Sequence, residues 1–511
     1  MSQLPISAHL SEVFLKLPKG VDPIVAVFLV LSIEDGAREA ASPAEEKWFA
    51  QIRAKYYLDD GEAVKKFFGN RFTHMLPDGK KSSFGKYYSP TGAIHLLRDM
   101  LDPILRPADL LLDLCVGIGA FAFEFTGNEF YGFDIDPIAI QILKKMGFKF
   151  MVEMDALSFV DRARYNIPAN RCTVVVGNPP YNDWTSKNRR ASKIQVQAPM
   201  DPRIKNRDSG IAFMRAYFLV KPRAVAILHP MSYLVKPTIY DRLVNFGYRL
   251  ENCVIFSSRA FATHGSNAFP YVAALWVPRD LAAFEAGKDQ PKLTKEEIAQ
   301  EFQQIQDRHF RVVEIVEDKV TDFEKPFRAA DYRTIDHPSC RINKNANDKV
   351  SDIGLYQFNF RDLNSLISNG NLTNKLRDTT PVNLGTDGED LFKYAAVNAI
   401  KRYWKCSKKP FDFILGNLSP IYPRDLIETP LKFACLINTF FAHEMKFQPG
   451  LAKLRPWVYQ LAKNNPENDL LRRFALVILC DPVLSEGDPG REALKTECAE
   501  LVREAVDRLR S

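Results

Sequence analysis

The chain has 511 residues, of which 46% are hydrophobic and 26% are charged, and its formal net charge is +7. This composition is that of an ordinary soluble globular protein with two or three domains, and the positive charge favours a polyanionic partner. The eight cysteines include no Cys-x-x-Cys pair, which excludes a disulfide scaffold and a zinc framework and suits a reducing cytoplasm. The longest apolar run, Ile24 to Leu31, is too short to span a bilayer.

Residues 1–80 are expected to form a helical segment. Ile24–Ile33 is a buried helix or strand, and Ser42-Pro43-Ala44-Glu45 has the pattern of a helix start, with Ser at the N-cap, Pro at the first helical position and Glu at the third. This helix is expected to run from about Pro43 to Tyr57 and to bury one face. The segment is interpreted as a cap on the domain that follows.

Gly85-Lys-Tyr-Tyr-Ser-Pro90 precedes a helical pattern that begins near Ile94. Ser89 is expected to cap that helix, and the positive end of the helix favours a carboxylate. The next signal is an apolar strand that runs from Leu110 into Asp113 and is followed by Gly117 and Gly119. Glycines at such a turn let the backbone pass close to a ligand, but a simple tight turn also fits this pattern.

Acidic residues recur at a regular interval after this glycine loop. Asp134 ends the next apolar strand, 21 residues after Asp113, and Asp155 follows another 21 residues later. A carboxylate at the end of the second strand of a doubly wound fold can accept both hydroxyls of a ribose. Asp134 and Asp136 are the two candidates for this role. Successive parallel strands would place these acids along one edge of a sheet.

Val174-Val-Val-Gly-Asn-Pro-Pro-Tyr181 contains the strongest signal of the chain. Three β-branched residues form a buried strand, and the two prolines make a stiff turn that holds Asn178 and Tyr181 at the strand's carboxyl end. Asn178 follows Asp155 by 23 residues, so the turn belongs to the same predicted edge. Ligands bind at that edge in open α/β sheets.

Together these motifs resemble the gamma class of DNA adenine-N6 methyltransferases, over roughly residues 83–278. The family order is motifs X, I, II, III, IV and VIII, followed by a target-recognition region. The resemblance implies S-adenosylmethionine (AdoMet) as the cofactor and no metal. The cofactor residues that it implies are Tyr88, Ser89, Pro90, Asp113, Cys115, Gly117, Gly119, Asp134, Ile135, Asp155, Ala156 and Asn178. In the family pattern Gly-x-Asp-Ile-Asp-Pro the first acid binds the ribose, so Asp134 is the first choice and Asp136 is the alternative. The implied catalytic residues are Asn178, Pro179, Pro180 and Tyr181.

The chemistry of methyl transfer explains these residue types. An adenine N6 amine is a poor nucleophile because its lone pair is conjugated with the ring. Two acceptors aimed at its N–H groups, the Asn178 side-chain oxygen and a carbonyl of the Pro179-Pro180 turn, would draw the nitrogen towards a tetrahedral state. Tyr181 offers a ring on which a planar base can stack. A duplex adenine reaches such a turn only after base flipping.

Two further sets of residues are interpreted through this resemblance. Phe261 and Phe269, with Tyr271 third, compete for the base-stacking aromatic of motif VIII, although each is equally compatible with plain core. The polar stretch 182–208 is read as a loop that contacts DNA phosphates, and a second basic cluster lies in the C-terminal region. The backbone-contact candidates are Lys187, Arg189, Arg190, Lys193, Arg203, Lys205, Arg207, Lys401, Arg402 and Lys405.

The predicted fold class is α/β, a Rossmann-like class I methyltransferase with a doubly wound sheet, accompanied by a helical N-terminal segment and a separate C-terminal α+β domain. The expected domains are 1–80, the catalytic domain 81–280, and a DNA-binding target-recognition domain 281–511. A monomer that binds double-stranded DNA sequence-specifically is favoured, in the context of restriction-modification, phage defence or self-protection, and a separate restriction endonuclease as partner stays open.

Three rival interpretations stay open. The same chemistry could act on RNA or on a protein glutamine. A methyltransferase-fold DNA-binding protein without turnover is the second rival, and intact Asp134, Asp155 and Asn178 argue against it. A fused restriction-modification polypeptide is the third, although the chain shows no convincing nuclease motif.

Overall fold

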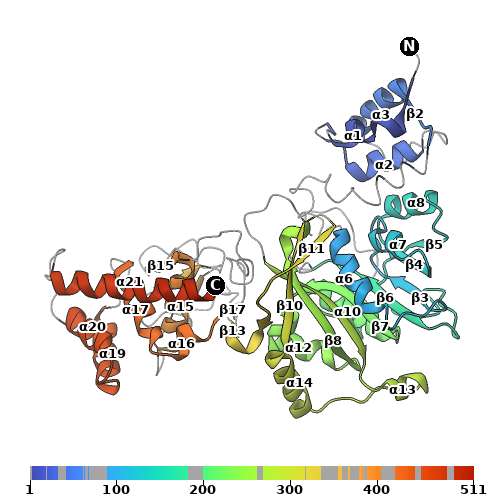
Figure 1. Cartoon of the computed structure of the whole chain (residues 1–511). Helices are drawn as coiled ribbons and strands as arrows, with labels where there is room; N and C mark the ends of the chain where they lie inside the picture. Colours follow the sequence, from blue (N-terminus) through green and yellow to red (C-terminus); the bar gives the residue numbers. More distant parts are fainter. Residues whose placement is uncertain are drawn as a thin grey trace. The chain divides into compact units, whose positions relative to one another are not determined.

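The computed structural model describes residues 3–15, 17–18, 20–32, 42–60, 63, 67, 89–181, 200–261, 269–316, 318–334, 355–358, 366–368, 379–382, 384, 388–403, 421–442, 451–479 and 488–510 (Figure 1). The chain forms two compact units. The first comprises Met1–Gly265, Tyr271–Gln304 and Phe310–Pro326, and the second comprises Ser266–Pro270, Ile305–His309 and Phe327–Ser511.

The first unit begins with a small group of short elements. They are β1 (Leu4–Pro5), η1 (Ile6–His9), α1 (Leu10–Leu15), α2 (Pro23–Leu31), α3 (Pro43–Lys55) and β2 (Tyr56–Tyr57). The capping box expected at Ser42 is present, because the Ser42 side chain accepts from the Glu45 amide and the Glu45 carboxylate accepts from the Ser42 amide at 2.7 Å. The apolar segment near Ile24, expected as helix or strand, is the helix α2.

A large, mostly parallel sheet dominates the first unit. Its order is β11-β10-β8-β9-β7-β6-β3-β4-β5. The bounds are β3 (Leu110–Asp113), β4 (Glu129–Asp134), β5 (Phe150–Glu153), β6 (Thr173–Gly177), β7 (Ala224–Pro230), β8 (Tyr248–Ser257), β9 (Pro270–Pro278), β10 (His309–Val316) and β11 (Lys319–Asp322). β5, β4, β3, β6 and β7 pair in parallel, and β9 pairs antiparallel with β7. β3 and β6 are buried at every residue, as central parallel strands are when both faces are covered.

Helices connect the strands. They are α6 (Thr91–Leu101), α7 (Ala120–Glu124), α8 (Pro137–Lys145), α10 (Ser209–Leu219), α11 (Ser232–Val235), α12 (Pro237–Val244), η2 (Ser258–Phe261), α13 (Leu281–Glu285) and α14 (Lys295–Asp307). α8 packs on β4 and β5, and α6 and α10 pack on β7. α2 of the N-terminal group packs against α8, and Ile142 of α8 belongs to the same buried core as α2.

Two expectations about this unit differ from the structure. Ser89 does not cap α6, because Pro90 occupies the N-cap position and the helix begins at Thr91. The sheet also continues past residue 280, through β10 and β11.

The second unit has α+β composition, as expected. Its strands and short turn are β12 (Phe327–Arg328), η3 (Ala329–Asp331), β13 (Tyr332–Thr334), β14 (Leu355–Phe358), β15 (Leu366–Ser368), β16 (Thr379–Val382) and β17 (Ile421–Pro423). Its helices are α15 (Glu389–Tyr403), α16 (Asp425–Glu428), α17 (Leu431–Ala442), α19 (Leu451–Asn464), α20 (Asp469–Leu479) and α21 (Pro489–Arg510). α17 is buried along most of its length and packs against α15 and α21. Among the described residues, no helix is both long and apolar enough to cross a membrane.

Candidate active site

The predicted site residues meet where the strand order reverses. β3 and β6 are neighbours in the sheet (Figure 1). β4 and β5 are added on the far side of β3, whereas β7 is added on the far side of β6. Ligands bind at this switch point in open α/β sheets. Asp113 ends β3, Asp134 ends the adjacent β4, and Asn178 directly follows β6. Because these strands are parallel, all three side chains stand at the same edge of the sheet.

The glycine loop after β3 is held by two carboxylates. Asp113 Oδ1 accepts from the Cys115 amide at 2.9 Å, and Asp134 Oδ2 accepts from the Gly117 amide at 2.8 Å. Gly117 (φ +53°) and Gly119 (φ +84°) both adopt left-handed conformations. A Cβ on Gly119 would collide with Leu143, whereas a Cβ on Gly117 would meet no described atom within 4 Å. Gly117 therefore exposes backbone that a ligand can approach closely.

Asp113 lies in the interior of this edge. Its side chain is 1% exposed, and burial raises the pKa of its carboxyl to about 7, with the charge of Asp134 adding to the rise and hydrogen bonds from Cys115 opposing it. The Cys115 thiol in turn contacts the Tyr217 hydroxyl at 3.3 Å. Asp113 therefore stabilises the glycine loop through the hydrogen bond that it accepts from the Cys115 amide.

Asp134 and Asp136 have different partners. Asp136 caps α8, since its Oδ1 accepts from the amides of Ile138 at 3.0 Å and Ala139 at 3.4 Å. Asp134 Oδ1 accepts from the Asp136 amide at 2.9 Å, and its other oxygen joins β4 to the glycine loop. Both oxygens of Asp134 thus accept backbone amides, and Asp136 is the N-cap residue of α8.

The remaining cofactor candidates have less distinctive surroundings. Asp155 Oδ1 accepts from the Leu157 amide at 3.0 Å, which is a local turn bond. Ala156 is buried, while Ile135 is 48% exposed beside Asp134 and presents an apolar surface. Ser89 and Pro90 are buried at the start of α6. Tyr88 lies outside the described residues.

The Asn-Pro-Pro-Tyr turn is held by the start of α10. Ser209 Oγ donates to the Pro180 carbonyl at 2.6 Å. Asn178 is half-buried and Pro179 is buried. Because the Pro180 carbonyl is engaged by Ser209, the Pro179 carbonyl is the one in the turn that suits the acceptor role.

The Tyr181 ring sits in an aromatic group. Tyr233 and Tyr271 both meet it edge-on, with ring centroids 6.1 Å and 5.6 Å away. Tyr271, ranked third from the sequence, is thus the motif VIII candidate that contacts Tyr181. Phe261 is buried against Tyr271 with ring centroids 4.8 Å apart, and Phe269 is half-buried.

Sequence reasoning missed the residues that fix this group. Tyr233 donates its hydroxyl proton to Asp208 Oδ1 at 2.6 Å, and the same oxygen accepts from the Gly210 amide at 2.9 Å to cap α10. A Cβ on Gly210 would lie 2.4 Å from both the Tyr181 ring and the Tyr233 hydroxyl. The Asp-Ser-Gly sequence at a helix start was the available signal, and it indicates a cap without revealing what the helix end contacts.

The residues predicted to contact the DNA backbone are spread over both units of the structure. Arg203 makes an ion pair with the buried Asp201 at 2.6 Å, which ties it to the local structure. Lys205 and Arg207 are exposed. Lys401 and Arg402 lie in α15 of the second unit. Five candidates fall outside the described residues: Lys187, Arg189, Arg190, Lys193 and Lys405.

No cluster of three or more His, Cys, Asp or Glu residues with the spacing of a metal site occurs in the described part of the chain. No protein-family model matches this chain, and no curated protein matches it.

Several solved structures resemble the chain at low identity. They include the modification subunit of a protein described as a type I restriction enzyme, from Vibrio vulnificus (14% identity, 62% of this chain and 66% of that chain, TM-score 0.34). A class I S-adenosylmethionine-dependent methyltransferase from Listeria monocytogenes is 12% identical over 56% of this chain and 91% of that chain, with a TM-score of 0.36. A protein described as an RNA methyltransferase, from Pyrococcus horikoshii, is 14% identical over 43% and 98%, with a TM-score of 0.31. The strand order itself, with a switch point between β3 and β6, is that of an open, doubly wound, Rossmann-like α/β sheet.

Proposed function

We propose that this chain is a site-specific DNA adenine-N6 methyltransferase that takes its methyl group from AdoMet. The observation that carries the proposal is the Asn-Pro-Pro-Tyr turn at the carboxyl end of β6, directly beside the carboxylate-braced glycine loop at the end of β3. The turn brings the methyl acceptor, and the loop the methyl donor, to one edge of the sheet.

The residues of the loop fit AdoMet. Backbone at Gly117 is open to close approach, and Asp134 supplies a carboxylate suited to two ribose hydroxyls. When bound, AdoMet supplies an electrophilic methyl group on a sulfonium, so the chain needs neither a metal nor a low-pKa nucleophile. What the chain must supply is a binding site, orientation and exclusion of water.

The turn fits an amine attached to an aromatic ring. The Asn178 side-chain oxygen and the Pro179 carbonyl accept from the two N–H groups of the amine and draw its lone pair out of conjugation. The carbonyl is part of a proline turn whose last carbonyl is tied to Ser209, so it needs little reorganisation. Tyr181, with Tyr271 and Tyr233 around it, provides the aromatic surface for a flipped base.

The net charge of +7 favours a nucleic acid over a protein as the methyl acceptor. The choice of DNA over RNA rests on the motif order and on the second α+β unit, which is proposed as the target-recognition domain. A role in restriction-modification or self-protection accompanies this assignment.

Labelled AdoMet tested in parallel against unmethylated DNA, bulk RNA and ribosomal or release-factor protein decides the acceptor. The proposal predicts label in DNA, absent with Asn178→Ala. Label in RNA or protein would overturn the acceptor and keep the chemistry. No label in any substrate, with AdoMet still bound, would support the rival without turnover.

A further inference from the structure

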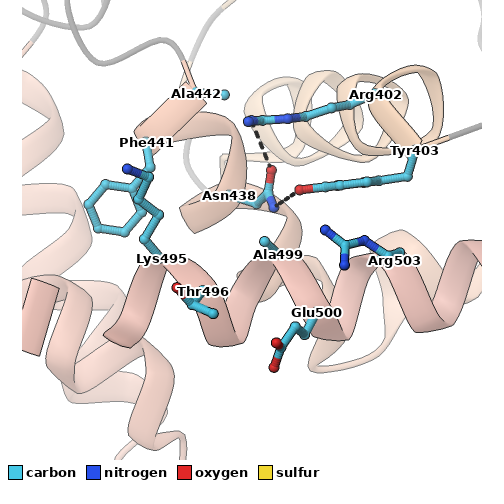
Figure 2. A pocket seen from close by; sticks show the side chains of 10 residues that line it. All are labelled: Arg402, Tyr403, Asn438, Phe441, Ala442, Lys495, Thr496, Ala499, Glu500 and Arg503. Atoms are coloured by element: carbon cyan, nitrogen blue, oxygen red, sulfur yellow. Dashed lines mark hydrogen bonds between the residues drawn. The ribbon is translucent and has the colours of Figure 1, made fainter. Parts of the chain in front are cut away.

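A cavity of about 230 Å³ lies in the C-terminal unit, between α15, α17 and α21 (Figure 2). Arg402 and Tyr403 come from α15, Asn438 from α17 and Arg503 from α21. The volume is below the roughly 300–1,000 Å³ of sites for whole small molecules. It suits a single charged group attached to a larger molecule outside.

A buried amide sets the geometry of this cavity. Asn438 is 4% exposed, and its Nδ2 donates to the Tyr403 hydroxyl at 2.8 Å while its Oδ1 accepts from Arg402 Nη1 at 3.4 Å. Figure 2 shows the Tyr403 ring between the side chains of Arg402 and Arg503. The two guanidinium carbons lie 5.8 Å and 5.7 Å from the centre of that ring. Both cations are thus oriented on one aromatic ring.

Both arginines are exposed, and within the described residues neither Arg402 nor Arg503 makes an ion pair, although Glu500 lines the same cavity. Arg473 of the same unit, by contrast, pairs with Asp469 at 2.8 Å and with Glu497 at 2.5 Å. Lys495, which also lines the cavity, pairs with Glu492 at 3.2 Å.

We propose that this cavity, which we call the Tyr403 pocket, binds a phosphodiester group of a nucleic-acid strand. An anion bound beside the two like charges would offset their mutual repulsion. Guanidinium groups present planar forks of N–H donors that match the oxygens of a phosphate. The inference rests on the proposed function for its partner, a nucleic acid, and assigns the residues that hold its backbone.

The test uses the full chain, a fluorescent 30-base-pair duplex and a fluorescent RNA of the same length, with anisotropy measured at several salt concentrations. Arg402→Gln with Arg503→Gln is expected to weaken binding about tenfold and to reduce the salt dependence by about one unit of slope per arginine. Arg503→Gln alone avoids the bond to Asn438 and is expected to give about half of that slope change. The matched control, Arg472→Gln with Arg473→Gln, removes the same charge from arginines that already pair with carboxylates. It is expected to bind within about twofold of the wild type.

Bound AdoMet and the thermal midpoint of each variant show that the protein is folded. Equal losses in the two double variants, or wild-type binding by Arg402→Gln with Arg503→Gln, would overturn the inference. So would an affinity for inorganic phosphate that depends on these arginines while nucleic-acid binding does not. Binding of RNA in place of DNA, still dependent on both arginines, would support the phosphodiester site and contradict only the acceptor in the proposed function.

Discussion

The Ser209 hydroxyl donates a 2.6 Å hydrogen bond to the carbonyl oxygen of Pro180. This bond links the first residue of α10 to the turn that follows β6, across 29 positions of sequence. Farther along α10, Tyr217 contacts the Cys115 thiol of the glycine loop at 3.3 Å. One helix therefore supports both the proposed acceptor side and the proposed cofactor side of the site.

Ser209→Ala is predicted to lower kcat while leaving the affinity for AdoMet unchanged. The lost bond is a neutral hydrogen bond of about 0.5–1.5 kcal/mol, which corresponds to a rate reduced by about 3- to 10-fold. Single-turnover methylation and AdoMet titration separate the two effects, and Ser209→Thr, which keeps the hydroxyl, is expected to restore the rate. A loss of AdoMet affinity as large as the loss of rate would show that Ser209 only stabilises the fold.

Asp134→Asn and Asp136→Asn are predicted to behave differently although the residues are two positions apart. Asp134→Asn removes the carboxylate assigned to the ribose, so the dissociation constant for AdoMet is expected to rise at least about tenfold. Asp136→Asn replaces one good N-cap residue of α8 with another. It is expected to change the dissociation constant for AdoMet by less than about threefold. Isothermal titration calorimetry measures both, and the reverse ranking would make Asp136 the ribose ligand.

Gly177→Ala is predicted to destabilise the protein and to disturb the site. A Cβ at this position would lie 2.9 Å from Asp113 Oδ1 and 3.1 Å from the Tyr217 hydroxyl. Overpacking of this kind costs about 1–3 kcal/mol in unfolding free energy. The control is Gly127→Ala, where a Cβ would meet no described atom within 4 Å. Thermal unfolding should show a lower midpoint for the first variant alone, and equal midpoints would mean that the sheet edge has room at Gly177.

Asp113 predicts a specific pH dependence of stability. Burial raises the pKa of its carboxyl from 3.8 to about 7, so the folded state keeps a proton that the unfolded state releases. The stability contributed by this group is therefore fully present below its unfolded pKa and is lost as the pH rises through about 7. Relative to Asp113→Asn, the free energy of unfolding of the wild type should fall by up to about 1.4 kcal/mol per pH unit between pH ~4 and ~7. Urea unfolding at several pH values measures this difference, and parallel curves for the two proteins would rule out a protonated Asp113.

Local signals in the sequence were sufficient for β3, β4, β6 and the glycine loop, but not for β10 and β11. Helix capping shows that a local pattern does not always predict the N-cap residue. Ser42 and Ser89 both precede proline, but only Ser42 is followed by a glutamate at the third helical position, Glu45, that completes a capping box. The corresponding residue after Ser89 is Gly92, and the structure moves the cap to Pro90. The Ser-Pro dipeptide therefore caps a helix at Ser42 but not at Ser89, because the residue three positions later is Glu45 in one case and Gly92 in the other.

Long-range contacts were beyond the reach of the sequence. Tyr271 meets Tyr181 because β9 inserts antiparallel beside β7, a topology that no short pattern encodes. Tyr233 lies in α11, which follows β7, whereas Asp208 precedes α10, and neither residue belongs to a recognised motif. The hydrogen bond from the Gly117 amide to Asp134 depends likewise on how β3 and β4 align.

The most direct test of the central claim is mass spectrometry of nucleosides from DNA methylated by the purified protein, beside the Asn178→Ala variant. The starting DNA comes from a bacterial host that lacks adenine methylation. The account predicts N6-methyladenine with the wild type and none with the variant. N4-methylcytosine in place of N6-methyladenine, or N6-methyladenine that persists in Asn178→Ala, would contradict the account.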